Sequence, residues 1–145
     1  MEHTPLTLLN LCSPLQYVRS ENRSAPALNG ETLFCYEVDS VQGGSIEPDR
    51  ERFLGKLLFT GEKLTETPSG GTGKTEEFVS LPQGDYLFMQ CRSDAVLTPD
   101  EWLDLAIEQQ KDGLWERNRP GNLLYVRFLF EDGAFVTQVF RAVES

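Results

Sequence analysis

The chain has 145 residues, of which 39% are hydrophobic, and a formal net charge of −10. This length and apolar content predict one domain over residues 1–145 with a single hydrophobic core. The negative charge argues against a nucleic-acid partner, because phosphate binding needs clustered lysine and arginine. No apolar run reaches the eighteen residues of a membrane span, and the first residues lack the form of a secretory signal. We therefore expect a cytoplasmic protein that does not bind membranes.

Strand-like runs fill most of the first two-thirds of the chain, and no internal repeat is evident. They cover residues 6–11, 15–19, 31–39, 53–64, 77–81 and 85–92. In the third run Phe34, Tyr36 and Val38 alternate with other side chains, so we expect this aromatic face to pack inward. Residues 48–54 are a weak candidate for a short helix.

A helix is predicted to begin at Thr98. Thr98, Pro99 and Glu101 have the pattern of a capping box with proline at the first helical position. Apolar residues then recur at helical spacing and form one stripe, made by Trp102, Leu103, Ala106 and Ile107. The pattern predicts a long helix that covers the sheet.

The last forty residues predict a β-hairpin, because Asp132-Gly133 separates two β-rich runs, residues 123–130 and 135–143. A two-residue turn fixes the register, which opposes Phe130 with Phe135, Phe128 with Thr137 and Val126 with Val139 on one face. We expect this apolar face to pack under the helix. The other face opposes Leu129 with Val136, Arg127 with Gln138 and Tyr125 with Phe140. This mixed face is either a ligand wall or the half-wet outer face of an antiparallel sheet.

Taken together, these elements predict an α+β fold. It consists of a twisted, mainly antiparallel sheet covered by the one long helix, with room for a second short helix. Cys12, Cys35 and Cys91 form no metal-binding spacing and are expected to be reduced core thiols. With His3 as the single histidine, we expect neither a metal site nor a histidine-based catalytic triad, and we assign no catalytic residue.

Residues 69–75, Ser-Gly-Gly-Thr-Gly-Lys-Thr, are similar to a phosphate-binding loop. The full pattern needs a glycine where this chain has Pro68. It also needs a helix immediately afterwards, whereas Phe78 and Val79 read as a strand that two carboxylates precede. We interpret this stretch as a hairpin loop and expect no cofactor.

The order of strand, turn, strand, helix and closing hairpin resembles the gyrase-inhibitor-like (GyrI-like) small-molecule-binding family, over residues 76–143. The resemblance rests on Leu81-Pro82-Gln83-Gly84-Asp85-Tyr86, on Trp102, and on residues 123–128 and 137–143. It implies an aromatic-lined pocket between sheet and helices for a small organic ligand, with a cationic or an amphipathic molecule as the two options. This chain has Arg127 where members usually carry a glutamate that meets a cationic ligand.

The candidate pocket residues are the aromatic and charged side chains that such a pocket uses. They are Tyr36, Glu37, Tyr86, Trp102, Trp115, Tyr125, Arg127 and Phe128. Arg127 lies among apolar neighbours, where a partly buried arginine needs an anionic ligand or a salt-bridge partner. For each aromatic residue, an ordinary place in the core is at least as good an interpretation.

Two other functions stay open. One is a module or inhibitor that binds another protein through its acidic surface, as a monomer or a homodimer. The other is a small hydrolase, for which Glu37 is the one acid in a position where burial raises the pKa. No spaced pair of acids supports catalysis, so enzymatic activity is the least favoured of the three.

Overall fold

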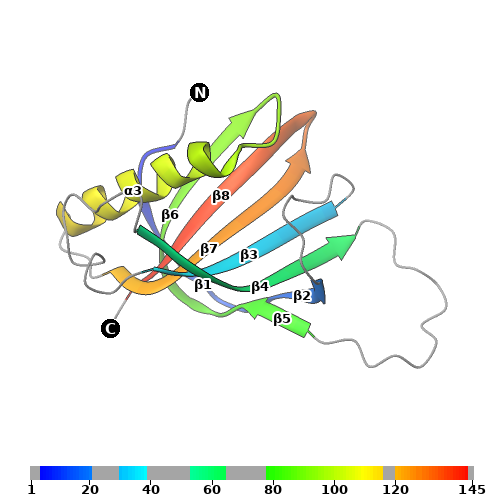
Figure 1. Cartoon of the computed structure of the whole chain (residues 1–145), viewed down its shortest axis with the longest axis horizontal. Helices are drawn as coiled ribbons and strands as arrows, with labels where there is room; N and C mark the ends of the chain where they lie inside the picture. The colour runs from blue at the N-terminus through cyan, green and yellow to red at the C-terminus, as the bar shows by residue number, and fades with distance from the viewer. Residues whose placement is uncertain (1–3, 21–29, 39–52, 65–77, 116–119, 144–145) are drawn as a thin grey trace.

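The computed structural model describes residues 4–20, 30–38, 53–64, 78–115 and 120–143. Within these residues, eight strands form one antiparallel sheet and one helix packs against it (Figure 1). The elements are β1 (Thr7–Leu11), β2 (Leu15–Ser20), β3 (Gly30–Val38), β4 (Leu54–Leu64), β5 (Phe78–Leu81), β6 (Gly84–Ser93), α3 (Pro99–Trp115), β7 (Pro120–Glu131) and β8 (Ala134–Val143). The strand-rich α+β fold expected from the sequence is confirmed. The predicted strands begin and end within one residue of the expected positions, except that β7 begins at Pro120, three residues before the predicted start.

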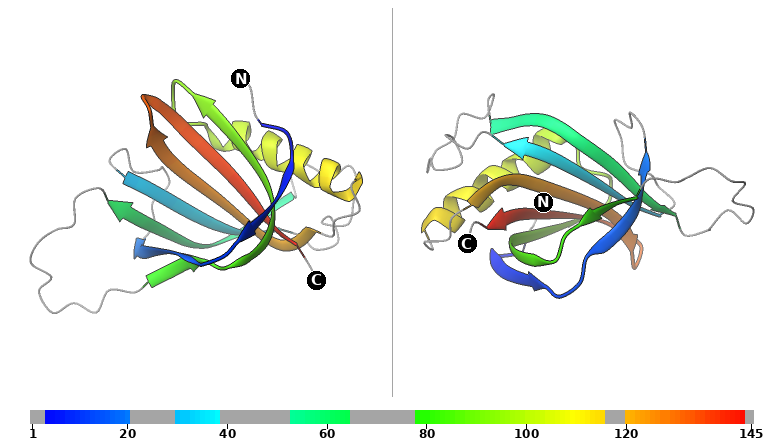
Figure 2. Two further views of the ribbon diagram at one scale, coloured as in Figure 1. Left: turned by 180° about the vertical axis from the view of Figure 1, so that it is seen from behind. Right: turned by 90° about the horizontal axis from the view of Figure 1, so that it is seen from below.

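The sheet curls because a two-stranded ribbon joins its two flanks. The strand order is β1-β6-β8-β7-β3-β4-β2-β5. On one flank β1 pairs with β6, and on the other β2 pairs with β5. Since β1 leads directly into β2 and β5 into β6, the two pairings form a ribbon that bends across the gap between the flanks (Figure 2). The curl encloses one face of the sheet and leaves the other face to the helix.

The strand order repeats between the two halves of the chain. If β1, β2, β3 and β4 are exchanged with β5, β6, β7 and β8 respectively, the strand order of the sheet becomes its own reverse. Every pairing between neighbouring strands is antiparallel. β3 and β7, which pair at the centre, exchange with each other. The two halves therefore share one topology, although no repeat is visible in the residues themselves.

Both faces of the central strands are buried, which the sequence did not predict for β3. Phe34 and Val38 pack in the core between sheet and helix, whereas Leu33 and Cys35 pack in a second core inside the curl. Alternation along a strand separates the two cores. The expected inward packing of the aromatic face is therefore confirmed, and the curl buries the opposite face as well.

The helix begins with the predicted capping box. The Thr98 backbone N–H donates to Glu101 Oε1 at 3.1 Å, and the Glu101 N–H donates to Thr98 Oγ1 at 3.4 Å. Between Pro99 and Gln109, where the side chains are described, the buried positions are Trp102, Leu105, Ala106 and Gln109. Leu103 and Ile107, which we expected in the stripe, are only partly buried at its border.

The expectation of a long covering helix is wrong. α3 has 17 residues, which corresponds to about 26 Å. It packs mainly on β6, β7 and β8, and its Trp102 also contacts Tyr36 of β3. The curl, instead of the helix, buries the apolar side chains on the other face of the sheet. The short helix suggested at residues 48–54 falls mainly outside the described residues, and Leu54 already begins β4. In the part of the chain that the structure describes, no helix has the length and apolar character needed to cross a membrane.

The closing hairpin has the predicted turn and register. Asp132 and Gly133 adopt φ angles of 51° and 77°, which a type I′ turn requires at both central positions. All six predicted cross-strand pairs are present, from Phe130 opposite Phe135 to Tyr125 opposite Phe140. The face with Val126, Phe128 and Val139 packs under the helix as predicted. The mixed face is not the outer face of the sheet, because it lies inside the curl.

Candidate functional site

Arg127, near the middle of β7, is the centre of a polar network inside the curl. Its Nη2 forms a salt bridge with Glu31 Oε1 at 2.8 Å, and its Nε donates to the Tyr17 hydroxyl at 2.8 Å. Its Nη1 donates to Gln138 Oε1 at 2.9 Å. The guanidinium therefore has a different partner on each of its three nitrogens, as its planar fork allows.

Tyr17 and Glu31 also contact each other. The Tyr17 hydroxyl donates to Glu31 Oε2 at 3.1 Å while it accepts from Arg127. Burial of Tyr17 raises the pKa of its hydroxyl far above the usual value, against the opposing effect of Arg127. Tyr17 is therefore a neutral hydroxyl at physiological pH, and it links the carboxylate to the guanidinium.

The opposite side of Arg127 is supported by two glutamines. Gln138 Nε2 donates to Gln90 Oε1 at 2.8 Å, which fixes the Gln138 amide with its oxygen towards Arg127. We call the five side chains of Tyr17, Glu31, Gln90, Arg127 and Gln138 the Arg127 network. They come from β2, β3, β6, β7 and β8, so the network joins the ribbon to the centre of the sheet.

The network remains accessible to solvent. The Arg127 side chain is 17% exposed and that of Glu31 is 25% exposed. In an ordinary buried ion pair, protein groups surround both charges, because charges removed from water need full compensation. Here a charged pair lies inside the fold and can still be reached from outside.

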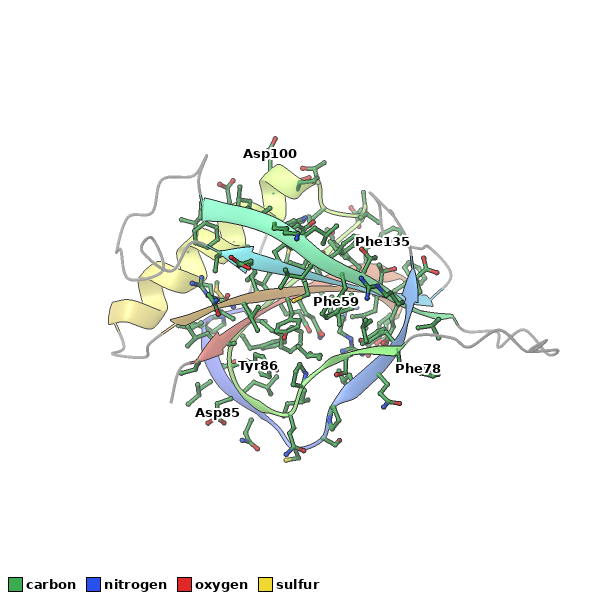
Figure 3. The ribbon with its side chains drawn as sticks, turned by 60° about the horizontal axis from the view of Figure 1, so that its bottom comes forward. Phe59, Phe78, Asp85, Tyr86, Asp100 and Phe135 are labelled. Atoms are coloured by element: carbon green, nitrogen blue, oxygen red, sulfur yellow. The ribbon has the colours of Figure 1, made fainter. Side chains whose placement is uncertain are left out.

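Aromatic rings fill the curl next to this network. Tyr86 contacts Tyr125 and Phe140 edge to face, with ring centroids 6.0 and 5.8 Å apart. Phe59 and Phe88 border the same cluster and are only partly buried. Figure 3 shows Phe59 and Tyr86 on the enclosed side of the sheet. The interior thus combines a partly exposed charged network with an aromatic wall.

The hydroxyl groups of this wall are neutral and have partners. The Tyr86 hydroxyl donates to the Pro82 carbonyl oxygen at 2.6 Å, and burial raises its pKa to about 12. Tyr125 shares a hydrogen bond with the Cys35 thiol, whose pKa burial raises to about 11. At neutral pH these groups serve as hydrogen-bonding groups and not as nucleophiles or bases.

Six of the eight candidates from the sequence separate into two groups. Tyr86, Tyr125 and Arg127 lie inside the curl, as described above. Tyr36, Trp102 and Phe128 belong to the core between sheet and helix, where the Tyr36 and Trp102 ring centroids are 5.3 Å apart.

The other two candidates lie elsewhere. Glu37 is exposed on β3, so the burial on which its suggested catalytic role depended is absent. Trp115 is the last residue of α3, and its side chain lies outside the described residues.

Sequence reasoning missed most partners of Arg127. Gln138 was found opposite Arg127, because the hairpin register follows from a local turn. Tyr17 and Glu31 were read only as members of strands, and no local signal in the sequence indicates which strands are neighbours. The sequence left open whether Arg127 meets an anionic ligand or a salt-bridge partner. The structure shows a salt bridge with Glu31, and the pair lies inside the curl instead of on an outer face.

The cysteines are only partly as expected. Cys35 and Cys91 are buried free thiols, whereas Cys12 is exposed at the corner between β1 and β2, so its assignment to the core is wrong. Among the described residues, no three His, Cys, Asp or Glu side chains lie together as metal ligands would.

The sequence matches no protein-family model and no curated protein. Inference about function therefore starts from the geometry of the Arg127 network and its aromatic neighbours.

Proposed function

We propose that this protein is a small-molecule-binding domain whose ligand contacts the Arg127 network inside the curled sheet. The observation that carries the proposal is the salt bridge between Arg127 and Glu31, which five strands organise inside the fold and which is still 17% and 25% exposed on its two sides. Ligand sites typically combine apolar walls with a few convergent polar groups. This interior has both.

The arrangement of the second half also supports the proposal. The stretch that resembles the GyrI-like family forms β5, β6, α3, β7 and β8, in the order that the resemblance implies. We place the ligand inside the curl because Trp102 and Phe128, on the helix side, are packed core residues only 3% and 6% exposed.

The test is a thermal-shift screen of the wild type against cationic, anionic and neutral aromatic compounds. A ligand that binds only the folded state raises its stability by RT ln(1 + [L]/Kd). We expect at least one class to raise Tm by several degrees, and the shift to disappear in Arg127→Gln. Lys56→Gln is the matched control, because it removes one positive charge from an exposed position on β4. No shift with any class, or equal shifts in wild type and Arg127→Gln, would overturn the proposal.

A protein-interaction surface is the second candidate, favoured by one exposed apolar pair. Val18 and Phe78 are opposite each other on β2 and β5 and are 37% and 62% exposed. Figure 3 labels Phe78. Large exposed apolar side chains that lie side by side are typical of contact surfaces. If this pair mediates self-association, sedimentation velocity should show a dimer for the wild type and a monomer for Phe78→Ser. A monomer for both would remove this route to a dimer.

A further inference from the structure

We propose that the ligand is an amphipathic carboxylate, and that its carboxylate group takes the place of Glu31 on Arg127. This inference rests on the proposed function and specifies the ligand's charge. It follows from an asymmetry in the Arg127 network. One member of the central ion pair is held firmly by other groups, whereas the other can leave.

Arg127 is the firmly held member. Two of its three hydrogen bonds go to the neutral groups of Tyr17 and Gln138, and Gln138 is in turn fixed by Gln90. Its strand pairs with β3 on one side and β8 on the other. The guanidinium would therefore keep its place if Glu31 moved away, with Nη2 free to bind another oxyanion.

Glu31 is the member that can leave. It is the second residue of β3, whereas Arg127 lies well inside β7, and its side chain is the more exposed of the two. Its side chain is held by Arg127 Nη2 and by the Tyr17 hydroxyl. A carboxylate released at the end of a strand can regain hydration, which offsets the loss of its partners.

The choice between an anionic and a cationic ligand follows from what each would leave behind. An incoming carboxylate exchanges one oxyanion for another, so Arg127 stays paired and Glu31 moves towards water. An incoming cation would have to draw Glu31 away and leave the guanidinium inside the curl without a counter-charge. Uncompensated buried charge is strongly destabilising, so the network favours the anion.

The groups around Arg127 suit a carboxylate with an apolar body. Arg127 Nη2 and the Tyr17 hydroxyl now bind the two oxygens of Glu31, and they present the same two donors to a ligand carboxylate. Phe88 precedes Gln90 by two positions on the same face of β6, and Phe59 precedes Gly61, which faces Tyr17. These partly buried rings offer apolar surface for the rest of the molecule.

The test uses two probes of the same shape and opposite charge, 2-naphthoate and 2-naphthylmethylammonium, titrated by calorimetry at pH 7. We expect the wild type to bind naphthoate roughly tenfold more tightly than the ammonium probe. Arg127→Gln should weaken naphthoate binding by about tenfold or more, and Lys56→Gln should leave it unchanged. Glu31→Gln should strengthen it by about fivefold, because the competing carboxylate is gone.

The Glu31→Gln result distinguishes this exchange from any simpler role of the network. If Glu31 were only a structural partner of Arg127, the change would weaken binding or leave it unaltered, and either result would overturn the inference. Preference for the ammonium probe would overturn it as well, while leaving the proposed function intact. If neither probe binds while other compounds still bind in an Arg127-dependent way, the inference would again be overturned and the proposed function would stand.

Folding of each variant is checked by near-ultraviolet circular dichroism. Should Arg127→Gln fail to fold, the comparison of wild type, Glu31→Gln and Lys56→Gln with the two probes still decides the question. Failure of every compound class on the wild type would instead remove the proposed function itself.

Discussion

The side-chain amide of Gln109, in α3, donates a hydrogen bond to the backbone carbonyl oxygen of Val139, in β8, at 2.8 Å. The same Nε2 donates to the carbonyl oxygen of Leu87 in β6 at 3.0 Å. Gln109 is completely buried. A single buried polar side chain thus ties the helix to the backbones of two neighbouring strands.

Replacing Gln109 with leucine should destabilise the protein by about 1–3 kcal/mol, because two buried hydrogen bonds are lost. Gln109→Glu should cost more, since it places a carboxylate against two carbonyl oxygens. Urea denaturation measures both changes. Glu108→Gln, on the exposed side of the helix, should stay within about 0.5 kcal/mol of the wild type. Wild-type stability in Gln109→Leu would show that apolar packing alone holds the helix.

Gly61 allows the ribbon to approach the sheet closely. A Cβ atom at this position would lie 2.7 Å from Tyr17 Cβ and 2.7 Å from Val79 Cγ2. Gly61→Ala should therefore destabilise the protein by about 1–3 kcal/mol through overpacking. Removing one of the two clashes should reduce this cost, so Gly61→Ala combined with Val79→Ala should lose less than the sum of the single changes. Strict additivity in thermal denaturation would show that the two positions do not interact.

The parts of the fold that the sequence predicted are those that local chemistry determines. The capping box depends on residues three apart, Thr98 and Glu101, and the hairpin register depends on Asp132-Gly133. In both cases the residues that make the contacts are close in the chain, so the pattern specifies the geometry.

The curl and the site depend on contacts between distant segments. Arg127 lies 110 residues from Tyr17 and 96 residues from Glu31 along the chain. Alternation shows that one face of a strand is apolar, but it does not show which strand is adjacent. The sequence therefore identified Arg127 as a group that needs a partner without showing which strand provides it.

The stability of the protein should fall at alkaline pH. Burial raises the pKa of Cys35 from 9.0 to about 11 and that of Tyr86 from 10.0 to about 12, and the pKa values of Tyr17 and Tyr125 are raised further. Above pH 9 the unfolded chain releases these protons before the folded chain does, so the free energy of unfolding decreases as pH rises.

The free energy of unfolding should decrease by roughly 2 kcal/mol or more between pH 8 and pH 11. Urea denaturation at one-unit intervals of pH measures it. Cys35→Ala should show a smaller decrease between pH 9 and pH 10, because the group with the lowest ordinary pKa has been removed. A free energy of unfolding that stays constant up to pH 11 would contradict the enclosure of these groups by the curl.

The three thiols should react at very different rates. Cys12 is exposed, whereas Cys35 and Cys91 are each 1% exposed and burial raises the pKa of both. Only the thiolate reacts, and a thiol whose pKa is about 11 is about 0.1% ionised at pH 8. Ellman's reagent at pH 8 should therefore modify one thiol per chain rapidly in the native protein and three in denaturant.

Cys12→Ser identifies the fast thiol, since the native variant should show no rapid reaction and its unfolded form should show two reactive thiols. Persistence of a fast phase in this variant would mean that Cys35 or Cys91 is accessible in the folded protein. Cys35 lies in the aromatic cluster beside the Arg127 network. The rate at which Ellman's reagent modifies Cys35 in the native protein therefore also reports how readily the curl opens. A carboxylate ligand bound at Arg127 should slow it further, whereas a ligand bound elsewhere should leave the rate unchanged.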